Sequence, residues 1–189
     1  MTCAEEKEKM TQEPEVWILR LGHRVFRDKR ITTHLALVGR AFGASGIYIE
    51  GDADPKIKEK VEEVNKTWGG EFVVSFVSNW IDFVKKWKSE EGTVVHLTMY
   101  GLPFEDVINL IKDEKKKVLV IVGGKKVPQV AYEVADYNLA VTNQPHSEVA
   151  AIALFLDRYF EGKEPLHRNP KVKIVPTPRG KFVISRSLQ

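Results

Sequence analysis

Along nearly the whole chain, short runs of apolar residues alternate with stretches in which apolar positions recur every three or four residues. Dense apolar runs are typical of strands, and the wider spacing is typical of helices. Strands are therefore predicted over 16–21, 47–49, 72–77, 93–99, 117–122 and 137–141. The run from Lys117 to Val122 is rich in β-branched residues and shows no alternation, which indicates a strand buried on both faces.

Helical patterns separate these strands. Asp54 and Pro55 supply a cap and a first-turn proline, and Asn79 is another capping residue. Gly69 and Gly70 mark a helix end. The first expected helix covers 33–42, with Thr32 or Thr33 as its cap. Another follows residue 79 and carries apolar positions 81, 84 and 87. The remaining helices are expected over 55–68, around 107–111, over 128–134 and over about 147–159.

This repeated order predicts an α/β fold, in which a mainly parallel sheet carries helices on both faces and binds ligands beyond the carboxyl ends of its strands. Residues 163–189 break the order, because VKIV and KFVIS flank a Pro-Thr-Pro-Arg-Gly turn and so predict a terminal hairpin. The charged first residues predict disorder. The expected organisation is a disordered lead over 1–14, a main domain over 15–162 and a basic appendage over 163–189.

Composition narrows the class of protein. Of 189 residues, 43% are hydrophobic and 29% are charged, which is ordinary for a soluble globular domain. No apolar run approaches the ~20 residues that cross a bilayer, and the polar, acidic start is unlike a signal peptide, so a cytoplasmic protein without membrane attachment is expected. Cys3 is the only cysteine, which excludes an intramolecular disulfide and a cysteine-based zinc site.

The net charge of +3 conceals two basic segments. From Arg20 to Arg40 there are six basic residues and one acidic residue, Asp28. From Lys163 to the end there are seven basic residues and one acidic residue, Glu164. Basic segments on an otherwise acidic body favour a polyanionic partner, although solvated surface charge explains either segment about equally well when it is taken alone.

Candidate chemistry lies in the segments that follow the fourth, fifth and sixth strands, over 97–101, 123–128 and 142–148. Gly123 and Gly124 would let main chain approach a small ligand, although a plain turn explains a glycine pair about as often. The nucleotide-binding patterns G-x-G-x-x-G and G-x-x-x-x-G-K-[ST] are absent. The five histidines lack metal-ligand spacing, and Ser147, His146 and Asp157 lack a nucleophile elbow, which disfavours a metal site and a serine hydrolase.

Three longer segments resemble one known family. They read LRLGHRVFRDKRITTHLALVGRAFGASG at 19–46, VGGKKVP at 122–128 and VTNQPHSEVAAIALFLDR at 141–158. They are similar to the archaeal tRNA cytidine-56 2′-O-methyltransferases, which belong to the SPOUT class. The resemblance implies a C-terminal trefoil knot, S-adenosylmethionine bound in that knot, a homodimer, and ribose methylation of a T-loop cytidine in tRNA.

The resemblance also implies a cofactor site. Leu97, Val127 and Val141 would hold the adenine, while main-chain groups of the other segments would bond its edge and the ribose. Leu97 or Val141 taken alone would be explained as a core residue. The three segments 97–101, 123–128 and 142–148, however, follow adjacent strands, which indicates a shared site. The implied cofactor-binding residues are Leu97, Gly123, Gly124, Lys125, Lys126, Val127, Val141, Thr142, Asn143, Gln144, Pro145, His146, Ser147 and Glu148.

Methyl transfer to a ribose requires an aligned 2′-hydroxyl, and a nearby guanidinium favours its deprotonation. SPOUT ribose methyltransferases carry such an arginine in their first motif, whereas this chain has Leu37 at that position. The catalytic candidates are Arg20, Arg24 and Arg40. The expected RNA-binding residues are Arg24, Arg27, Lys29 and Arg30. Because Arg20 interrupts an apolar strand, where an unpaired charge is costly, a functional or paired role is expected for it.

Two alternatives stay open at this point. The chain could be a SPOUT enzyme that methylates another RNA or another atom. It could also be a non-catalytic α/β module that binds RNA and grips only phosphate with its glycine segments. Binding of S-adenosylmethionine separates the enzymes from the module, and the position of the methyl group separates the two enzymes.

Overall fold

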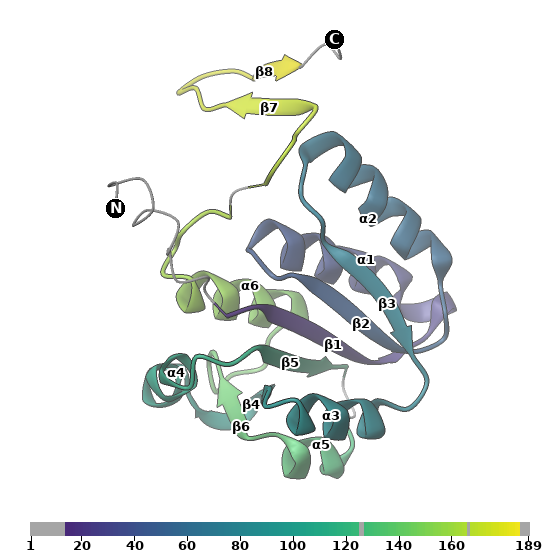
Figure 1. Cartoon of the computed structure of the whole chain (residues 1–189), viewed down its shortest axis with the longest axis vertical. Coiled ribbons are helices and arrows are strands. Elements are labelled where there is room, and N and C mark those ends of the chain that lie inside the picture. The colour runs from purple at the N-terminus through teal and green to yellow at the C-terminus, as the bar shows by residue number, and fades with distance from the viewer. Residues whose placement is uncertain (1–13, 125–126, 166, 186–189) are drawn as a thin grey trace, which may run out of the picture.

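The computed structural model describes residues 14–124, 127–165 and 167–185. Its main body is a six-stranded sheet with the strand order β3-β2-β1-β5-β4-β6 (Figure 1). All neighbouring strands are parallel, which confirms the predicted sheet. The strands are β1 (Val16–His23), β2 (Gly46–Gly51), β3 (Val73–Val77), β4 (Thr93–Pro103), β5 (Val118–Gly123) and β6 (Tyr137–Ala140).

Helices cover both faces of the sheet, as predicted. One hydrophobic cluster joins the sheet to α1, α2, α4 and α6, and a second cluster joins its other face to α3 and α5. None of the helices in the described part of the chain is long and apolar enough to cross a membrane. The helices are α1 (Val25–Ala41), α2 (Pro55–Trp68), α3 (Trp80–Ser89), α4 (Phe104–Asp113), α5 (Gln129–Val134) and α6 (Glu148–Tyr159).

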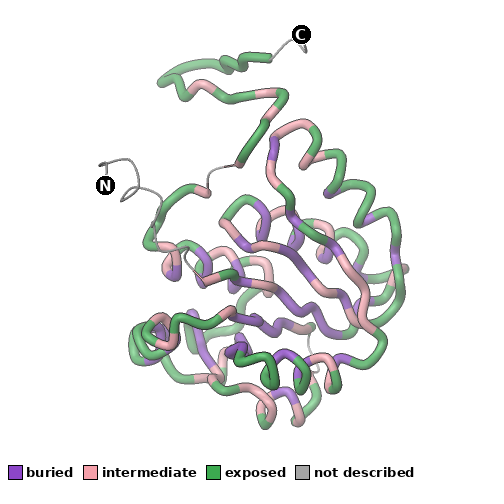
Figure 2. Tube along the Cα trace, in the orientation of Figure 1, coloured by how far each residue is buried: buried purple, intermediate pink, exposed green. Residues whose placement is uncertain are grey.

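Strands β1 and β5 form the buried middle of the sheet (Figure 2). All residues of β5 from Val118 to Val122 are buried, as its unbroken apolar run predicted. In β1, Ile18 joins the cluster with α1 and α6, whereas Leu19 and Leu21 join the cluster with α3. Because side chains alternate along a strand, Arg20 lies on the same face as Ile18, beneath α1 and α6.

The first helix corrects one expectation. It begins at Val25, eight residues before the predicted start, and neither Thr32 nor Thr33 is its cap, since both lie inside the helix. Thr32 is instead buried inside the helix, with its hydroxyl 2.8 Å from His23 Nδ1. The apolar spacing did not predict the first turns of this helix, because their residues are largely polar and Phe26 is fully exposed.

Strand β4 also differs from its prediction, which ended it at Met99. It continues to Pro103, but its pairing with β6 is irregular between Leu97 and Leu102. Gly101 lies in this irregular stretch, and a Cβ atom there would come within 2.6 Å of the backbone of Asn138 and Leu139. The absence of a side chain at Gly101 therefore allows the end of β4 to lie directly against β6.

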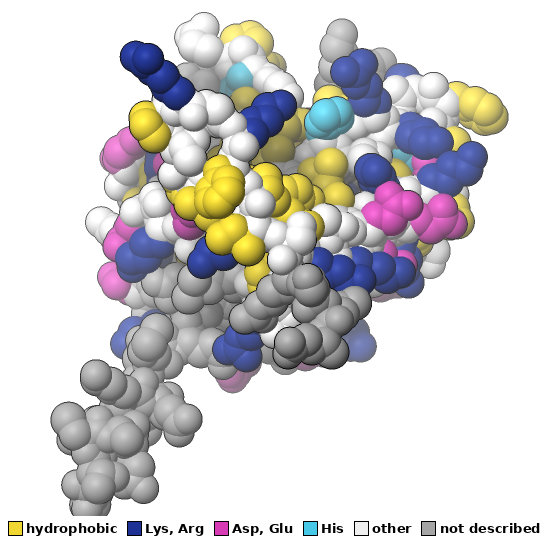
Figure 3. Space-filling model, turned by 90° about the horizontal axis from the view of Figure 1, so that it is seen from above, with side chains coloured by type: hydrophobic (Ala, Val, Ile, Leu, Met, Phe, Trp, Pro, Cys, Tyr) yellow, Lys and Arg dark blue, Asp and Glu magenta, His cyan; other side chains and the backbone are white. Residues whose placement is uncertain are grey.

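The predicted C-terminal hairpin is present. Strands β7 (Val172–Val175) and β8 (Phe182–Ser185) pair antiparallel and stand away from the main sheet (Figure 1). Its base is tied to the body by a 3.0 Å hydrogen bond from the Lys171 N–H to the Thr67 carbonyl. Seen from the hairpin end, apolar and basic side chains lie close to one another on the surface (Figure 3). Phe182 and Ile184 are among the exposed apolar side chains of the hairpin.

Candidate functional site

The segments that follow strands β4, β5 and β6 lie at one edge of the sheet, where parallel strands end together. The Asn143 side-chain amide donates hydrogen bonds to the carbonyls of Met99 at 2.8 Å and Gly101 at 3.1 Å. These bonds join the segment after β6 to the irregular end of β4. At the end of β5, Gly123 pairs with Leu21 of the central strand. Because β4 lies between β5 and β6 and all three strands run parallel, the segments that follow them leave the sheet at a common edge.

The three apolar residues assigned to the adenine divide between the two faces of the sheet. Leu97 and Val141 are buried in the cluster with α1 and α6. Val127 is half-buried and packs with the cluster on the α3 side, and a Cβ atom on Gly123 would lie 2.5 Å from Val127 Cγ2. Lys125 and Lys126 lie outside the described residues.

The segment between β6 and α6 is exposed from Thr142 to Ser147. Ser147 caps α6, since its hydroxyl accepts a 3.1 Å hydrogen bond from the Val149 N–H. His146 Nδ1 lies 3.1 Å from the Ser147 carbonyl. The residues of this segment, including Gln144 and Pro145, are therefore accessible to solvent beside the end of β4.

Arg20 forms a buried ion pair. Its Nη2 lies 3.2 Å from Oε1 of Glu148, and the side chains are 1% and 10% exposed. Its Nη1 also donates to the Leu21 carbonyl. Gly124 is also its neighbour, because a Cβ atom on Gly124 would lie 3.9 Å from Arg20 Nη2. The pairing expected for a charge inside an apolar strand is thus present.

Burial raises the pKa of Glu148, although the positive charges of Arg20 and Arg27 act in the opposite direction. The pKa of Asp28 is lowered, chiefly by the hydrogen bonds that it accepts from Arg27. Arg27 Nε and Nη2 contact the two carboxylate oxygens of Asp28, each at 2.7 Å. Asp28 also accepts a 3.1 Å hydrogen bond from the Arg24 N–H, so it fixes the first turn of α1.

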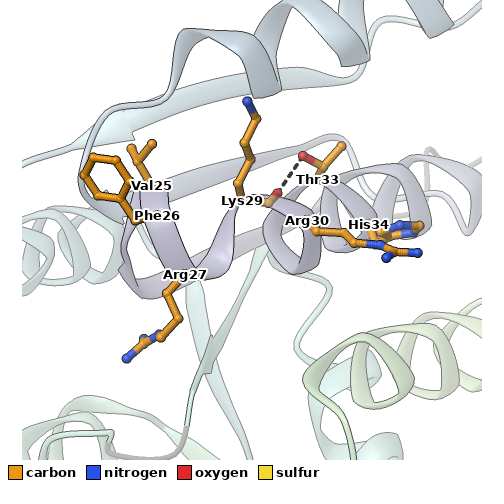
Figure 4. A pocket seen from close by; sticks show the side chains of 7 residues that line it. All are labelled: Val25, Phe26, Arg27, Lys29, Arg30, Thr33 and His34. Atoms are coloured by element: carbon orange, nitrogen blue, oxygen red, sulfur yellow. Dashed lines mark hydrogen bonds between the residues drawn. The ribbon is translucent and has the colours of Figure 1, made fainter.

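The expected RNA-binding residues lie together on this first part of α1. Arg24, Arg27, Lys29 and Arg30 are all exposed. A surface hollow of about 450 Å³ lies over the helix (Figure 4). Its lining residues are Val25, Phe26, Arg27, Lys29, Arg30, Thr33 and His34. The hollow therefore combines an exposed aromatic ring with three of the four predicted RNA-binding cations.

Arg40 does not join this group. It lies in the last turn of α1, about 24 Å along the helix axis from Arg24. Its guanidinium is buried and donates to Asn65 Oδ1 at 2.9 Å and to the Gly69 carbonyl. Burial lowers its pKa. These contacts give Arg40 a structural role in holding α1 against the end of α2.

The sequence reasoning missed two polar contacts beside the site. Thr98 Oγ1 lies 3.1 Å from the Tyr132 hydroxyl, which links the irregular part of β4 to α5. His96 Nδ1 lies 2.9 Å from Asn138 Oδ1 and joins β4 to β6. No periodicity signals such contacts, because each joins residues more than 30 positions apart. Among the described residues, no group of three His, Cys, Asp or Glu could hold a metal ion.

Comparison with known proteins identifies the family. A family model described as "tRNA ribose 2′-O-methyltransferase, aTrm56" matches residues 68–184, well over half of the chain. The chain belongs to this family. The tRNA (cytidine(56)-2′-O)-methyltransferase of Methanopyrus kandleri is 54% identical over 177 residues, which cover 92% of this chain and 98% of the relative. The enzyme of the same name from Thermococcus kodakarensis is 53% identical over 173 residues, which cover 88% and 95%.

Solved structures show the fold of this family member. The SpoU methyltransferase AviRb from Streptomyces viridochromogenes, solved in complex with the cofactor AdoMet, matches with a TM-score of 0.57 and 13% identity. The match covers 79% of this chain and 57% of AviRb, so the chain spans little more than half of that protein. The A. aeolicus TrmH/SpoU tRNA modifying enzyme matches with a TM-score of 0.57 and 13% identity over 79% of this chain and 75% of that one. These likenesses confirm the predicted fold, a mainly parallel sheet with helices on both faces.

Proposed function

We propose that this chain transfers a methyl group from S-adenosylmethionine to the 2′-oxygen of cytidine 56 in tRNA. The observation that carries the proposal is the identity of 54% to the Methanopyrus kandleri tRNA (cytidine(56)-2′-O)-methyltransferase along 98% of that enzyme. The shared edge formed by the ends of β4, β5 and β6 supports it. Chemically, the oxygen–carbon bond forms as the sulfur–carbon bond breaks, and the hydroxyl proton is lost.

The residues at this edge fit the cofactor. Gly124 is exposed, and the nearest atom to a Cβ placed on it is 3.9 Å away, so main chain is accessible there. The exposed segment 142–147 supplies further donors and acceptors, and Asn143 anchors it. Leu97 and Val141 offer apolar surface on one face, and Val127 offers it on the other. When bound, the cofactor supplies an electrophilic methyl group.

The task left to the protein is to align the ribose and to ease removal of its proton. Of the three catalytic candidates, Arg20 is buried in an ion pair and Arg40 lies at the far end of α1. Arg24 is exposed at the start of α1, beside the carboxyl end of β1. We therefore assign to Arg24 the contact with the developing alkoxide, whose charge a guanidinium stabilises.

Binding of tRNA is assigned to the exposed face of α1, where Arg27, Lys29 and Arg30 meet backbone phosphates and Phe26 offers a ring for stacking. A homodimer, a trefoil knot and a cytoplasmic location belong to the same proposal and rest on the family resemblance. The lead at 1–14 and the appendage at 163–189 are proposed as additions to a methyltransferase domain over 15–162.

The test is a methylation assay with transcribed tRNA and labelled S-adenosylmethionine, followed by mapping of the methyl group. The expected product carries 2′-O-methylcytidine at position 56, and a tRNA with 2′-deoxycytidine at that position accepts no methyl. Methylation of a base, or of another nucleotide, would refute the proposal. If calorimetry shows no binding of S-adenosylmethionine or S-adenosylhomocysteine, the chain is an RNA-binding module instead.

The role of Arg24 is tested in the same assay. Arg24→Ala should lower kcat by at least about 100-fold, which is typical for loss of one transition-state donor, with little change in the Kd for S-adenosylhomocysteine. Arg30→Ala serves as the comparison, since Arg30 lies six residues further along the chain in the same exposed region. If Arg30→Ala loses kcat while Arg24→Ala changes only KM for tRNA, the assignment to Arg24 is wrong.

A further inference from the structure

The ion pair between Arg20 and Glu148 connects two parts of the molecule to which the proposed function gives separate tasks. Arg20 lies in β1, shortly before the chain turns into the RNA-binding part of α1. Glu148 is the first residue of α6 and directly follows the cofactor segment 142–147. A contact of 3.2 Å between the two side chains therefore fixes the cofactor segment relative to the start of α1.

The environment of this pair indicates a role in geometry rather than in stability. Within the described residues, Arg20 Nε and Glu148 Oε2 are both buried without a hydrogen-bond partner. Burying two charges costs solvation, and apolar residues of similar volume often replace such pairs without loss of stability. A pair that also leaves two polar atoms unsatisfied is a poor way to stabilise a fold, but it holds two elements in one relative position.

A second cation extends the pair to the protein surface. The pKa of Arg27 is raised, mainly by its hydrogen bond to Asp28 and additionally by the negative charge of Glu148. Arg27 thus lies within electrostatic reach of the buried carboxylate while 58% of its side chain is exposed. Figure 4 shows that Arg27 points away from the side of α1 on which Lys29 lies. Helix α1, which carries Arg27, also packs against α6, the helix that begins at Glu148. Phosphate binding at Arg27 therefore acts on an element that contacts the helix of the ion pair.

We propose that Arg20 and Glu148 are positioning residues that couple cofactor binding to tRNA binding. The inference rests on the proposed function. Glu148 holds segment 142–147 against β1, and α6, which begins at Glu148, packs against α1, the helix that carries Arg27. Ordering of the cofactor segment consequently favours the arrangement of α1 that binds tRNA, and binding of tRNA favours the ordered cofactor segment. By thermodynamic linkage, each ligand raises the affinity for the other by the same factor.

The experiment measures the Kd for S-adenosylhomocysteine by calorimetry on the full chain, alone and with saturating unmodified tRNA transcript. Wild-type protein should bind S-adenosylhomocysteine about fivefold or more tightly when tRNA is present, the lower range of allosteric coupling. Glu148→Gln should reduce this ratio to about one, because the amide keeps the shape but loses the charge. A ratio of one in wild-type protein, or an unchanged ratio in Glu148→Gln, overturns the inference.

Arg27 and Lys29 form a matched pair of surface variants. Both are exposed cations on the first turns of α1, but the structure gives Lys29 no ion pair with any described residue. Arg27→Ala should raise the Kd for S-adenosylhomocysteine without tRNA about threefold, and it should have no further effect in the Glu148→Gln background. Lys29→Ala should weaken tRNA binding alone. Equal effects of the two variants on S-adenosylhomocysteine binding would contradict the coupling.

A purely structural role gives a different result, since it lowers the Tm of Glu148→Gln and leaves the coupling ratio intact. If Glu148→Gln does not fold, the double variant Arg20→Met/Glu148→Met removes both charges at similar volume and should fold with a ratio of about one. A double variant that keeps the wild-type ratio overturns the inference. Failure of the proposed function is seen separately, because wild-type protein would then not methylate cytidine 56.

Discussion

Gly101 provides a direct test of how the end of β4 is packed. In Gly101→Ala, the new Cβ would lie 2.6 Å from backbone atoms of Asn138 and Leu139, and backbone cannot rotate aside as a side chain can. Overpacking of this kind costs about 1–3 kcal/mol. The required shift would also weaken the two hydrogen bonds that Asn143 donates to the carbonyls of Met99 and Gly101, at about 0.5–1.5 kcal/mol each.

The combined loss is roughly 2–6 kcal/mol in the free energy of unfolding, or a drop in Tm of roughly 4–24 °C for a chain of this size. Urea denaturation and thermal unfolding measure it. Gly124→Ala is the matched control, because its Cβ meets nothing closer than 3.9 Å and its stability should stay within about 0.5 kcal/mol of wild type. If Gly101→Ala is as stable as Gly124→Ala, the close packing of β4 against β6 is wrong.

Three further predictions concern stability, pH and salt. Arg40→Met should lose about 1–3 kcal/mol of unfolding free energy in denaturant titration, because Arg40 donates hydrogen bonds to Asn65 and Gly69. Since these contacts lie away from the site, kcat of the folded enzyme should be unchanged. A large loss of kcat in fully folded protein would mean that Arg40 is a catalytic residue. Burial lowers the pKa of His96 below 6.5, so the folded state favours its neutral form. The free energy of unfolding should therefore be at its full value above about pH 6.5 and should fall as the pH drops towards the folded pKa. This fall should be steeper in wild type than in His96→Gln, and parallel curves would contradict the prediction. The slope of log affinity for tRNA against log salt should become shallower by about 0.7 in Lys29→Ala, and an unchanged slope would remove Lys29 from the phosphate contacts.

Much of the sheet could be predicted because burial leaves a direct mark on composition. The unbroken apolar run of β5 corresponds to its place in the middle of the sheet, and the Gly69–Gly70 pair correctly marks the end of α2. The start of α1 was missed because its first two turns face solvent on most sides, so no apolar stripe marks them. The extension of β4 was missed because an irregular register needs knowledge of its neighbour β6.

The candidate site was predictable in its location but not in its contacts. Parallel strands end at one edge, so the segments after β4, β5 and β6 were expected to meet. The sequence also indicates that Arg20 needs a partner, since it interrupts an apolar strand. It cannot say that the partner is Glu148, which lies 128 positions later. Long-range pairs of this kind depend on how α6 is laid across β1, and local pattern carries no information about that.

The strand order has a consequence for synthesis on the ribosome. The central strand β1 is made first, but one of its two neighbours, β5, follows about 100 residues later, since Val16 pairs with Val118. A nascent chain that has emerged only as far as β4 has one side of β1 without its partner, and an open strand edge invites pairing with other chains. Completion of the sheet is therefore slow and late, and chaperone capture should be strongest while residues 24–117 are being translated.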